Sequence, residues 1–302
     1  MKIVFMGTPE FAVPALNALI TSSHTVVAVV TGPDKERGRG QKVSFTAVKE
    51  AAIKNNIPVL QPEKLKDADF ISKLKSFNAD LFVVVAFRIL PREVFTIPSK
   101  GSFNLHGSLL PKYRGAAPIQ WALINGETET GVTTFMLEDK VDTGNILLQE
   151  KIKIDEEDDF GTLHDKMSLV GAEIILQTVS LIENGKYELK KQDDSLTSSA
   201  PKITKELCEI NWNKTALEIH NLIRGLSPFP GAFFMFKDKT IKIYKTKIVL
   251  NHNLNAGKFY QTKNSLAIGT GSGSLEILEL QQEGKRRMKI DEFLRGFSFV
   301  NK

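Results

Sequence analysis

Asn104 and His106 are two polar residues at the end of a short apolar segment, and their side chains suit acid–base and oxyanion chemistry. In a β-strand, residues i and i+2 share a face, so a strand at 102–106 would place both side chains together. A histidine can transfer a proton near neutral pH, and an asparagine amide can donate a hydrogen bond to a developing oxyanion. A strand-end histidine that only bonds the backbone is the commoner situation and stays an alternative.

The residues after this strand form a loop with ligand-binding potential. Lys112, Tyr113 and Arg114 place two cations and an aromatic ring between glycine and proline residues. This combination suits an anionic or flat heterocyclic ligand, whereas a solvated connection is the plainer alternative.

Asp142 lies in a polar connection between two segments predicted to be strands. Because it precedes Thr143 and Gly144, its first interpretation is a turn residue. The functional alternative is that its carboxylate reaches His106, orients the imidazole and stabilises the protonated ring.

The elements that would position these residues alternate along the chain. Short runs rich in β-branched residues are separated by helical patterns, which is typical of βαβ units and an open, mostly parallel sheet. Ligands bind such sheets at the carboxyl ends of the strands, where Asn104 and His106 lie. The predicted strands are 2–6, 25–31, 59–60, 81–87, 102–106, 130–137 and 146–154, and the predicted helices are 10–22, 45–55, 68–77, 117–125 and 162–183.

A second domain is predicted beyond a polar, proline-containing boundary at 193–205. One helix at 215–224 is followed by five short strands at 232–236, 241–248, 257–260, 265–269 and 275–280. A five-stranded barrel of the oligonucleotide-binding (OB) type is the commonest fold of this kind. We therefore predict an α/β domain at 1–200 and an OB-like β-barrel domain at 206–302.

Composition excludes several classes of protein. The 42% hydrophobic and 25% charged content predicts a soluble, packed protein. The longest apolar runs, 25–31 and 80–87, are far shorter than the ~20 residues of a membrane span. The first residues suit a strand better than a signal peptide. With a single cysteine, Cys208, and scattered histidines, we expect neither disulfides nor a metal site. We also expect a cytoplasmic protein and a monomer.

Positive charge is concentrated late in the chain. Residues 201–302 hold 17 Lys and Arg against 9 Asp and Glu, a net charge of +8, whereas residues 1–200 have a net charge of −3. This asymmetry favours a polyanion-binding module, although a chance imbalance on a solvated surface stays possible. The candidate contacts are Arg37, Arg39 and Lys42 in the loop at 32–42, and Arg286 and Arg287 in the run at 284–289.

The central motif carries a family resemblance. Residues 104–111 (NLHGSLLP) and 113–120 (YRGAAPIQ) resemble the signature of the folate-dependent formyltransferases. GTPEFA at 7–12, ETGVTTF at 129–135 and DTG at 142–144 extend the resemblance over essentially the whole chain. The segment at 86–91 (AFRILP) departs from the family pattern, because it is one residue shorter and lacks a glycine.

The resemblance implies a fold and a reaction. It implies a Rossmann-like catalytic domain that transfers the formyl group of 10-formyltetrahydrofolate to the α-amino group of methionyl-initiator tRNA, without a metal. The C-terminal OB-like domain would bind the tRNA. Asn104, His106 and Asp142 would be catalytic, the segment near Arg39 would contact tRNA, and the folate would meet Ser108, Leu109, Leu110 and Pro111.

Two other functions stay open. A related formyltransferase could act on an amino sugar nucleotide, which would not require a basic C-terminal domain. A non-catalytic RNA-binding protein could use the barrel alone, but it would not need Asn104, His106 and Asp142 on one sheet edge.

Overall fold

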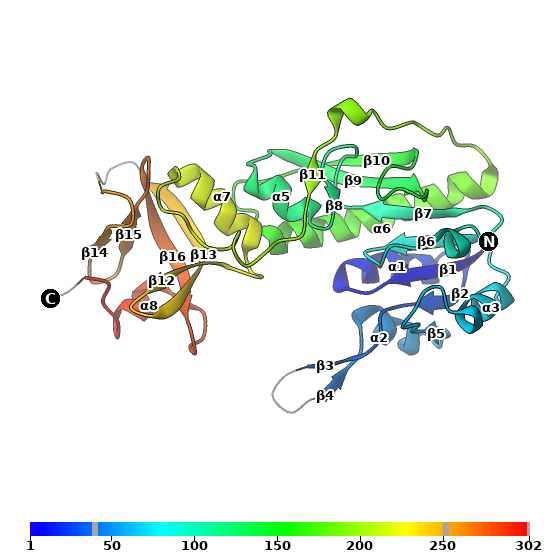
Figure 1. Ribbon diagram of the computed structural model, residues 1–302, viewed down its shortest axis with the longest axis horizontal. Coiled ribbons are helices and arrows are strands. Elements are labelled where there is room, and N and C mark those ends of the chain that lie inside the picture. Colours follow the sequence, from blue (N-terminus) through cyan, green and yellow to red (C-terminus); the bar gives the residue numbers. More distant parts are fainter. Residues whose placement is uncertain (38–41, 250–253, 301–302) are drawn as a thin grey trace. The chain divides into compact units, whose positions relative to one another are not determined.

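The computed structural model describes residues 1–37, 42–249 and 254–300 (Figure 1). Two compact units make up the chain. The first contains Met1–Gly115, Thr130–Lys153 and His164–Ser199, and the second contains Ala116–Glu129, Ile154–Leu163 and Ala200–Lys302. The division of the sequence into domains at 1–200 and 206–302 stays a prediction.

A seven-stranded sheet forms the centre of the first unit, and it confirms the predicted α/β fold. Its strand order is β10-β9-β7-β6-β1-β2-β5. The pairs β1–β2, β1–β6, β6–β7 and β2–β5 are parallel, whereas β7 and β9 are antiparallel. The strands are β1 (Lys2–Gly7), β2 (Thr25–Val30), β5 (Val59–Leu60), β6 (Leu81–Val85), β7 (Ser102–His106), β9 (Glu129–Met136) and β10 (Ile146–Lys153).

The helices of this unit begin where the sequence supplies a cap. Thr46 and Asp67 each accept a hydrogen bond from a backbone N–H in the first turn of α2 and α3, which stabilises these helix ends. The helical elements are η1 (Glu10–Ala12), α1 (Val13–Thr21), α2 (Ala47–Lys54), α3 (Ala68–Ser76), α4 (Arg92–Phe95), α6 (Phe160–Asn184), which begins in the second unit, and η2 (Asp194–Leu196). The strands β8 (Arg114–Gly115) and β11 (Ser199–Ala200) have two residues each.

The basic segment predicted as a loop contains an antiparallel pair, β3 (Lys35–Arg37) and β4 (Lys42–Ser44). At its base, Lys49 Nζ lies 2.5 Å from Asp34 Oδ2, and Gln61 Nε2 donates to Asp34 Oδ1 at 2.8 Å. These hydrogen bonds hold the pKa of the Asp34 carboxyl below its usual value. The predicted contact Arg39 lies outside the described residues.

An antiparallel sheet with the order β12-β13-β16-β15-β14 forms most of the second unit, and β17 pairs with β16. Its elements are α5 (Pro118–Ile124), α7 (Ala216–Leu226), β12 (Ala232–Phe236), β13 (Lys239–Val249), β14 (Phe259–Gln261), β15 (Leu266–Gly269), β16 (Ser274–Gln282), β17 (Met288–Lys289) and α8 (Ile290–Leu294). The strands that end this order meet through their side chains: the rings of Phe236 and Phe259 lie 5.4 Å apart. The sheet therefore curls around its core, as a barrel-like domain requires.

Helix α7 closes the core of this sheet. Its N-terminus is a capping box, in which Thr215 and Glu218 satisfy each other's backbone N–H groups. A Cβ on Gly225 would lie 2.9 Å from the Gln120 carbonyl oxygen, so this glycine allows α7 to approach α5 closely. Among the described residues, the helices include none that is both long and apolar enough to cross a membrane.

Candidate active site

Strand β7 carries Asn104 and His106 in the interior of the sheet. Asn104 is opposite Val84 of β6 and Phe135 of β9, and His106 is opposite Thr133 of β9. Asn104 is half-buried, whereas His106 is only 6% exposed. Because the two residues are separated by one position, their side chains share a face of the sheet, as predicted.

His106 is oriented by contacts on both ring nitrogens. Nε2 lies 2.8 Å from the carbonyl oxygen of Tyr113. Since a carbonyl only accepts, Nε2 carries the hydrogen and donates. Nδ1 faces Oδ2 of Asp142 at 3.9 Å, which is within ion-pair distance but longer than a hydrogen bond. The structure thus brings Asp142 to His106, and it also contains the backbone contact expected of a strand-end histidine.

Asp142 reaches this position from the loop between β9 and β10. Its side chain is 12% exposed, and its Oδ2 accepts a hydrogen bond of 2.9 Å from the backbone N–H of Gly115. The backbone of Asp142 has a φ of +54°, in the left-handed region that non-glycine residues rarely adopt. The turn interpretation and the orienting role therefore describe the same residue, and neither excludes the other.

The segment 108–111 is fixed by its polar and apolar contacts. Ser108 is fully buried and its hydroxyl donates to the Lys112 carbonyl at 2.6 Å, while Leu110 packs with Phe135 and Ile146. Thr133 donates to the Ser108 carbonyl at 2.6 Å. Leu109 and Pro111 are half-buried. Folate contact by Ser108, Leu109, Leu110 and Pro111 stays a prediction.

Arg114 is not available to an anionic ligand, contrary to the interpretation of its loop. Its guanidinium lies 2.9 Å from Asp194 Oδ1 and donates twice to Gln192 Oε1. Lys112 is exposed, whereas the Tyr113 side chain is 6% exposed. The loop therefore offers one solvated cation, and its arginine supports the protein's own structure.

Gln192 is the residue of this region that the sequence analysis missed. Its Nε2 donates to the carbonyl oxygens of Asp142 and Gly144, at 2.9 and 2.8 Å. It lies between α6 and η2, 50 positions after Asp142, in a segment without periodicity. A glutamine in such a segment gives no sequence signal for these contacts.

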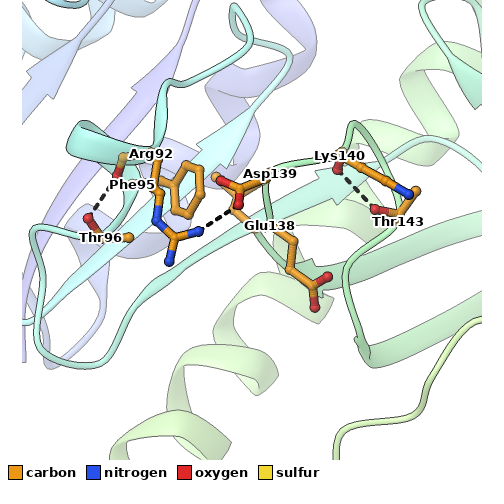
Figure 2. A pocket seen from close by; sticks show the side chains of 8 residues that line it. Arg92, Phe95, Thr96, Glu138, Asp139, Lys140 and Thr143 are labelled. Carbon is orange, nitrogen blue, oxygen red and sulfur yellow. Dashed lines mark hydrogen bonds and ion pairs between the residues drawn. The ribbon is translucent and has the colours of Figure 1, made fainter.

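A pocket of about 550 Å³ lies beside the loop that carries Asp142 (Figure 2). Phe95 and Leu137 are its apolar residues, and Arg92 donates to Asp139 at 2.6 Å across the rim. This volume is within the range of small-ligand sites. The remaining lining residues are Thr96, Glu138, Lys140 and Thr143, so the loop between β9 and β10 both lines the pocket and supplies Asp142.

The segment 86–91 lies between β6 and α4. This segment lacks the glycine of the family pattern. Its first residue, Ala86, adopts a φ of +48°. Arg88 donates to the carbonyl oxygens of Pro62 and Glu63 at 2.7 and 2.9 Å. Ile89 is 73% exposed, whereas Leu90 is buried.

Two of the predicted RNA contacts, Arg286 and Arg287, are surface residues with partners inside the protein. Arg286 pairs with Glu292, and Arg287 pairs with Glu279 while its guanidinium lies 4.5 Å from the centre of the Tyr244 ring. Tyr244 is 8% exposed, so its ring is largely covered and Arg287 lies over it. Arg37 and Lys42 are opposite each other in the β3–β4 pair.

Comparison with known proteins identifies two family models in this chain. The model described as "Formyl transferase" matches residues 1–179, and "Formyl transferase, C-terminal domain" matches residues 202–298. Proteins named "Methionyl-tRNA formyltransferase" from Flavobacterium johnsoniae and Caldanaerobacter subterraneus are 48% and 49% identical to it. The alignments cover 99% and 98% of this chain and 97% of each relative.

Solved structures extend the likeness to the fold. An N-formyltransferase from Helicobacter canadensis, in complex with folinic acid and dTDP-3-aminofucose, superposes with a TM-score of 0.68 at 24% identity. The superposition covers 95% of this chain and all of that one. At this identity, the likeness concerns the fold alone.

Proposed function

The chain belongs to the formyl transferase family, and from this premise we propose that it transfers the formyl group of 10-formyltetrahydrofolate to the α-amino group of methionyl-initiator tRNA. Relatives named for this activity align with nearly all of the chain. Within the structure, the observation that carries the proposal is the approach of the Asp142 carboxylate to His106 Nδ1, on the strand that also holds Asn104.

In the proposed reaction, the amine nitrogen attacks the formyl carbon and forms a C–N bond. The carbonyl oxygen then becomes an oxyanion, to which the Asn104 amide donates a hydrogen bond. His106 Nδ1, beside the Asp142 carboxylate, takes up the proton that the amine loses, and the resulting imidazolium helps to stabilise the oxyanion. Collapse of the tetrahedral intermediate breaks the bond to N10 of the folate, and the proton lost by the amine is returned to N10.

We propose that the folate co-substrate occupies the pocket beside the Asp142 loop. Phe95 and Leu137 suit a flat ring, and the polar groups around them suit its heteroatoms. Lys140 and Thr143 of the loop that carries Asp142 line this pocket, whereas Asn104, His106 and Asp142 are not among its lining residues. Folate contact by Ser108, Leu109, Leu110 and Pro111 is a separate part of the proposal, because none of these residues lines the pocket.

The charge distribution favours tRNA over an amino sugar nucleotide. A net charge of +8 in residues 201–302 and the cationic β3–β4 pair suit a large polyanion. We propose Arg37, Arg39, Lys42, Arg286 and Arg287 as phosphate contacts. A monomeric state and a cytoplasmic location belong to this proposal as well.

Formyl transfer to charged initiator tRNA, with an amino sugar nucleotide as competitor, tests the function. We expect formylmethionyl-tRNA as the product, whereas transfer to the sugar alone would overturn the proposal. Replacing Asn104 by Ala should lower kcat by about 10²–10³, because one oxyanion donor is lost. The matched control is Asn184→Ala, which removes an exposed amide at the end of α6 and should leave kcat unchanged.

A further inference from the structure

Gln192 has an unusual set of contacts for a glutamine. It is 5% exposed, and its side-chain amide makes four hydrogen bonds to residues distant in sequence. Arg114 donates to Oε1 from Nε at 3.0 Å and from Nη2 at 2.7 Å. Nε2 donates to the carbonyl oxygens of Asp142 and Gly144. Both N–H groups and the carbonyl oxygen of the side chain are therefore used.

The direction of these hydrogen bonds is chemically determined. A guanidinium only donates, so the oxygen of the Gln192 amide must face Arg114. The NH₂ group must then face the two carbonyl oxygens, which only accept. Arg114 therefore sets the orientation in which Gln192 can hold the backbone on both sides of Thr143.

The backbone segment that Gln192 holds, residues 142–144, has an unusual conformation at both ends. Asp142 has a positive φ, a conformation that most non-glycine residues avoid and that aspartate adopts where hydrogen bonds support it. At Gly144, a Cβ atom would lie 1.7 Å from the Met136 carbonyl oxygen, so the chain passes β9 without room for a side chain. Such a conformation persists only where neighbouring groups stabilise it.

The same set of residues also reaches the carboxylate. Gly115 donates its backbone N–H to Asp142 Oδ2 and follows Arg114 directly in sequence. Arg114 thus connects the two partners of Asp142: it precedes Gly115, which binds the carboxylate, and it orients Gln192, which binds the backbone carbonyl. The geometry fixes both parts of Asp142 relative to β7, where His106 lies.

On these grounds we propose that Gln192 is a positioning residue for the formyl transfer, acting through Asp142 and oriented by Arg114. This inference rests on the proposed function, because that function supplies the reaction. The contacts of Gln192 are observed independently of it. Gln192 holds the Asp142 backbone in the strained conformation that directs the carboxylate towards His106 Nδ1.

Gln192→Met keeps the length of the side chain and removes all four hydrogen bonds. A misplacement of about 1 Å in a reacting group costs up to about 10²-fold in rate. We expect kcat to fall 10- to 100-fold, with a smaller change in KM for folate and tRNA. Arg114→Met keeps the Gln192 amide but removes the group that orients it. This variant should lower kcat as well, by a smaller factor than Gln192→Met. Gln261→Met, which removes one half-buried glutamine contact in the second unit, is the matched control and should leave kcat unchanged.

A double-variant cycle separates positioning from general destabilisation. If Gln192 acts through Asp142, Gln192→Met should lower kcat little further in an Asp142→Ala background. An equal loss in both backgrounds would overturn the proposal, as would a lower Tm with unchanged kcat. If Gln192→Met does not fold, the same cycle is carried by Arg114→Met.

Hydrogen exchange gives a readout that needs no substrate. Amides in 140–145 should exchange faster in Gln192→Met than in the wild-type protein, and Gln261→Met should not change them. Faster exchange in Gln192→Met, together with a wild-type protein that does not formylate tRNA, would reject the proposed reaction and retain the loop-holding contact. Unchanged exchange with active wild-type protein would reject the role of Gln192 alone.

Discussion

Three proposed catalytic side chains are held in three different ways. Asn104 is placed by the pairing of β7 with both neighbouring strands. His106 is oriented by the Tyr113 carbonyl oxygen, and Asp142 by the Gly115 N–H. Backbone groups of the 113–115 segment thus contact both the histidine and the aspartate. The Gln192 side chain adds the contacts that hold the backbone at Asp142.

A substitution at Ala86 should make the protein more stable. Ala86 is exposed and has a φ of +48°, which costs alanine about 1–2 kcal/mol relative to an ordinary conformation. Glycine avoids this cost but loses about 0.5–1 kcal/mol of chain entropy on folding. Ala86→Gly should therefore raise the free energy of unfolding by roughly 0.5–1 kcal/mol, measured by urea denaturation. Ala51→Gly within α2 is the control and should lower it; a decrease for both variants would contradict the argument.

At this scale, the sequence predicted residues whose position follows from periodicity. Asn104 and His106 share a face because strand spacing requires it. For Asp142 the sequence left two interpretations, a turn residue first and a carboxylate that reaches His106 as the alternative. Gln192 and the internal pairing of Arg114 were not predictable, because both depend on contacts between an irregular segment and a loop. Such contacts have no period and are determined only by the tertiary fold.

Among the elements, the contact between α7 and β13 should respond to pH. His220 Nδ1 lies 2.8 Å from Thr246 Oγ1. Burial of the imidazole, followed by the nearby Arg224 charge, lowers the pKa of His220 below its ordinary value of 6.5. Below pH 6.5 the unfolded chain therefore takes up a proton more readily than the folded protein, and the folded state loses stability as the pH falls.

His220→Gln should remove this dependence, since glutamine keeps a hydrogen-bonding group but does not titrate. Urea denaturation of the wild-type protein and the variant between pH 7.5 and 5 measures the difference. The free energy of unfolding should fall more steeply with acidification in the wild type. Parallel pH curves for the two proteins would refute the assignment.

The elements themselves were predicted where apolar patterns are strong. The strands 102–106 and 232–236 have the predicted bounds, and the long helix α6 differs by two residues or fewer at either end. Helix α4 was missed because it has four residues, and the β3–β4 pair because its residues are nearly all polar. Strand 81–87 was predicted too long, since the positive φ at Ala86 ends β6 at Val85.

At the scale of the whole molecule, charge asymmetry should determine how salt affects binding to tRNA. If Arg286 and Arg287 contact phosphates, Arg286→Gln/Arg287→Gln should reduce the slope of log K against log salt by about two units, roughly one for each contact. Their ion pairs with Glu292 and Glu279 are exposed, so breaking them should cost at most about 1 kcal/mol of stability.

Arg295→Gln is the control for this measurement. Arg295 forms an exposed ion pair with Asp291 and was not predicted as a phosphate contact. The slope should be unchanged in this variant. A slope equal to that of the wild type in the Arg286→Gln/Arg287→Gln variant would exclude both residues from the phosphate contacts.

The loop between β9 and β10 lines the pocket with one part and presents Asp142 with another. If the folate occupies this pocket as proposed, its contacts with Lys140 and Thr143 restrain the loop on both sides of Asp142. Binding energy gained far from the reacting carbon can then be used to align the acid–base groups. Shortened donors that leave the pocket partly empty should accordingly be poor in turnover even when they saturate the enzyme.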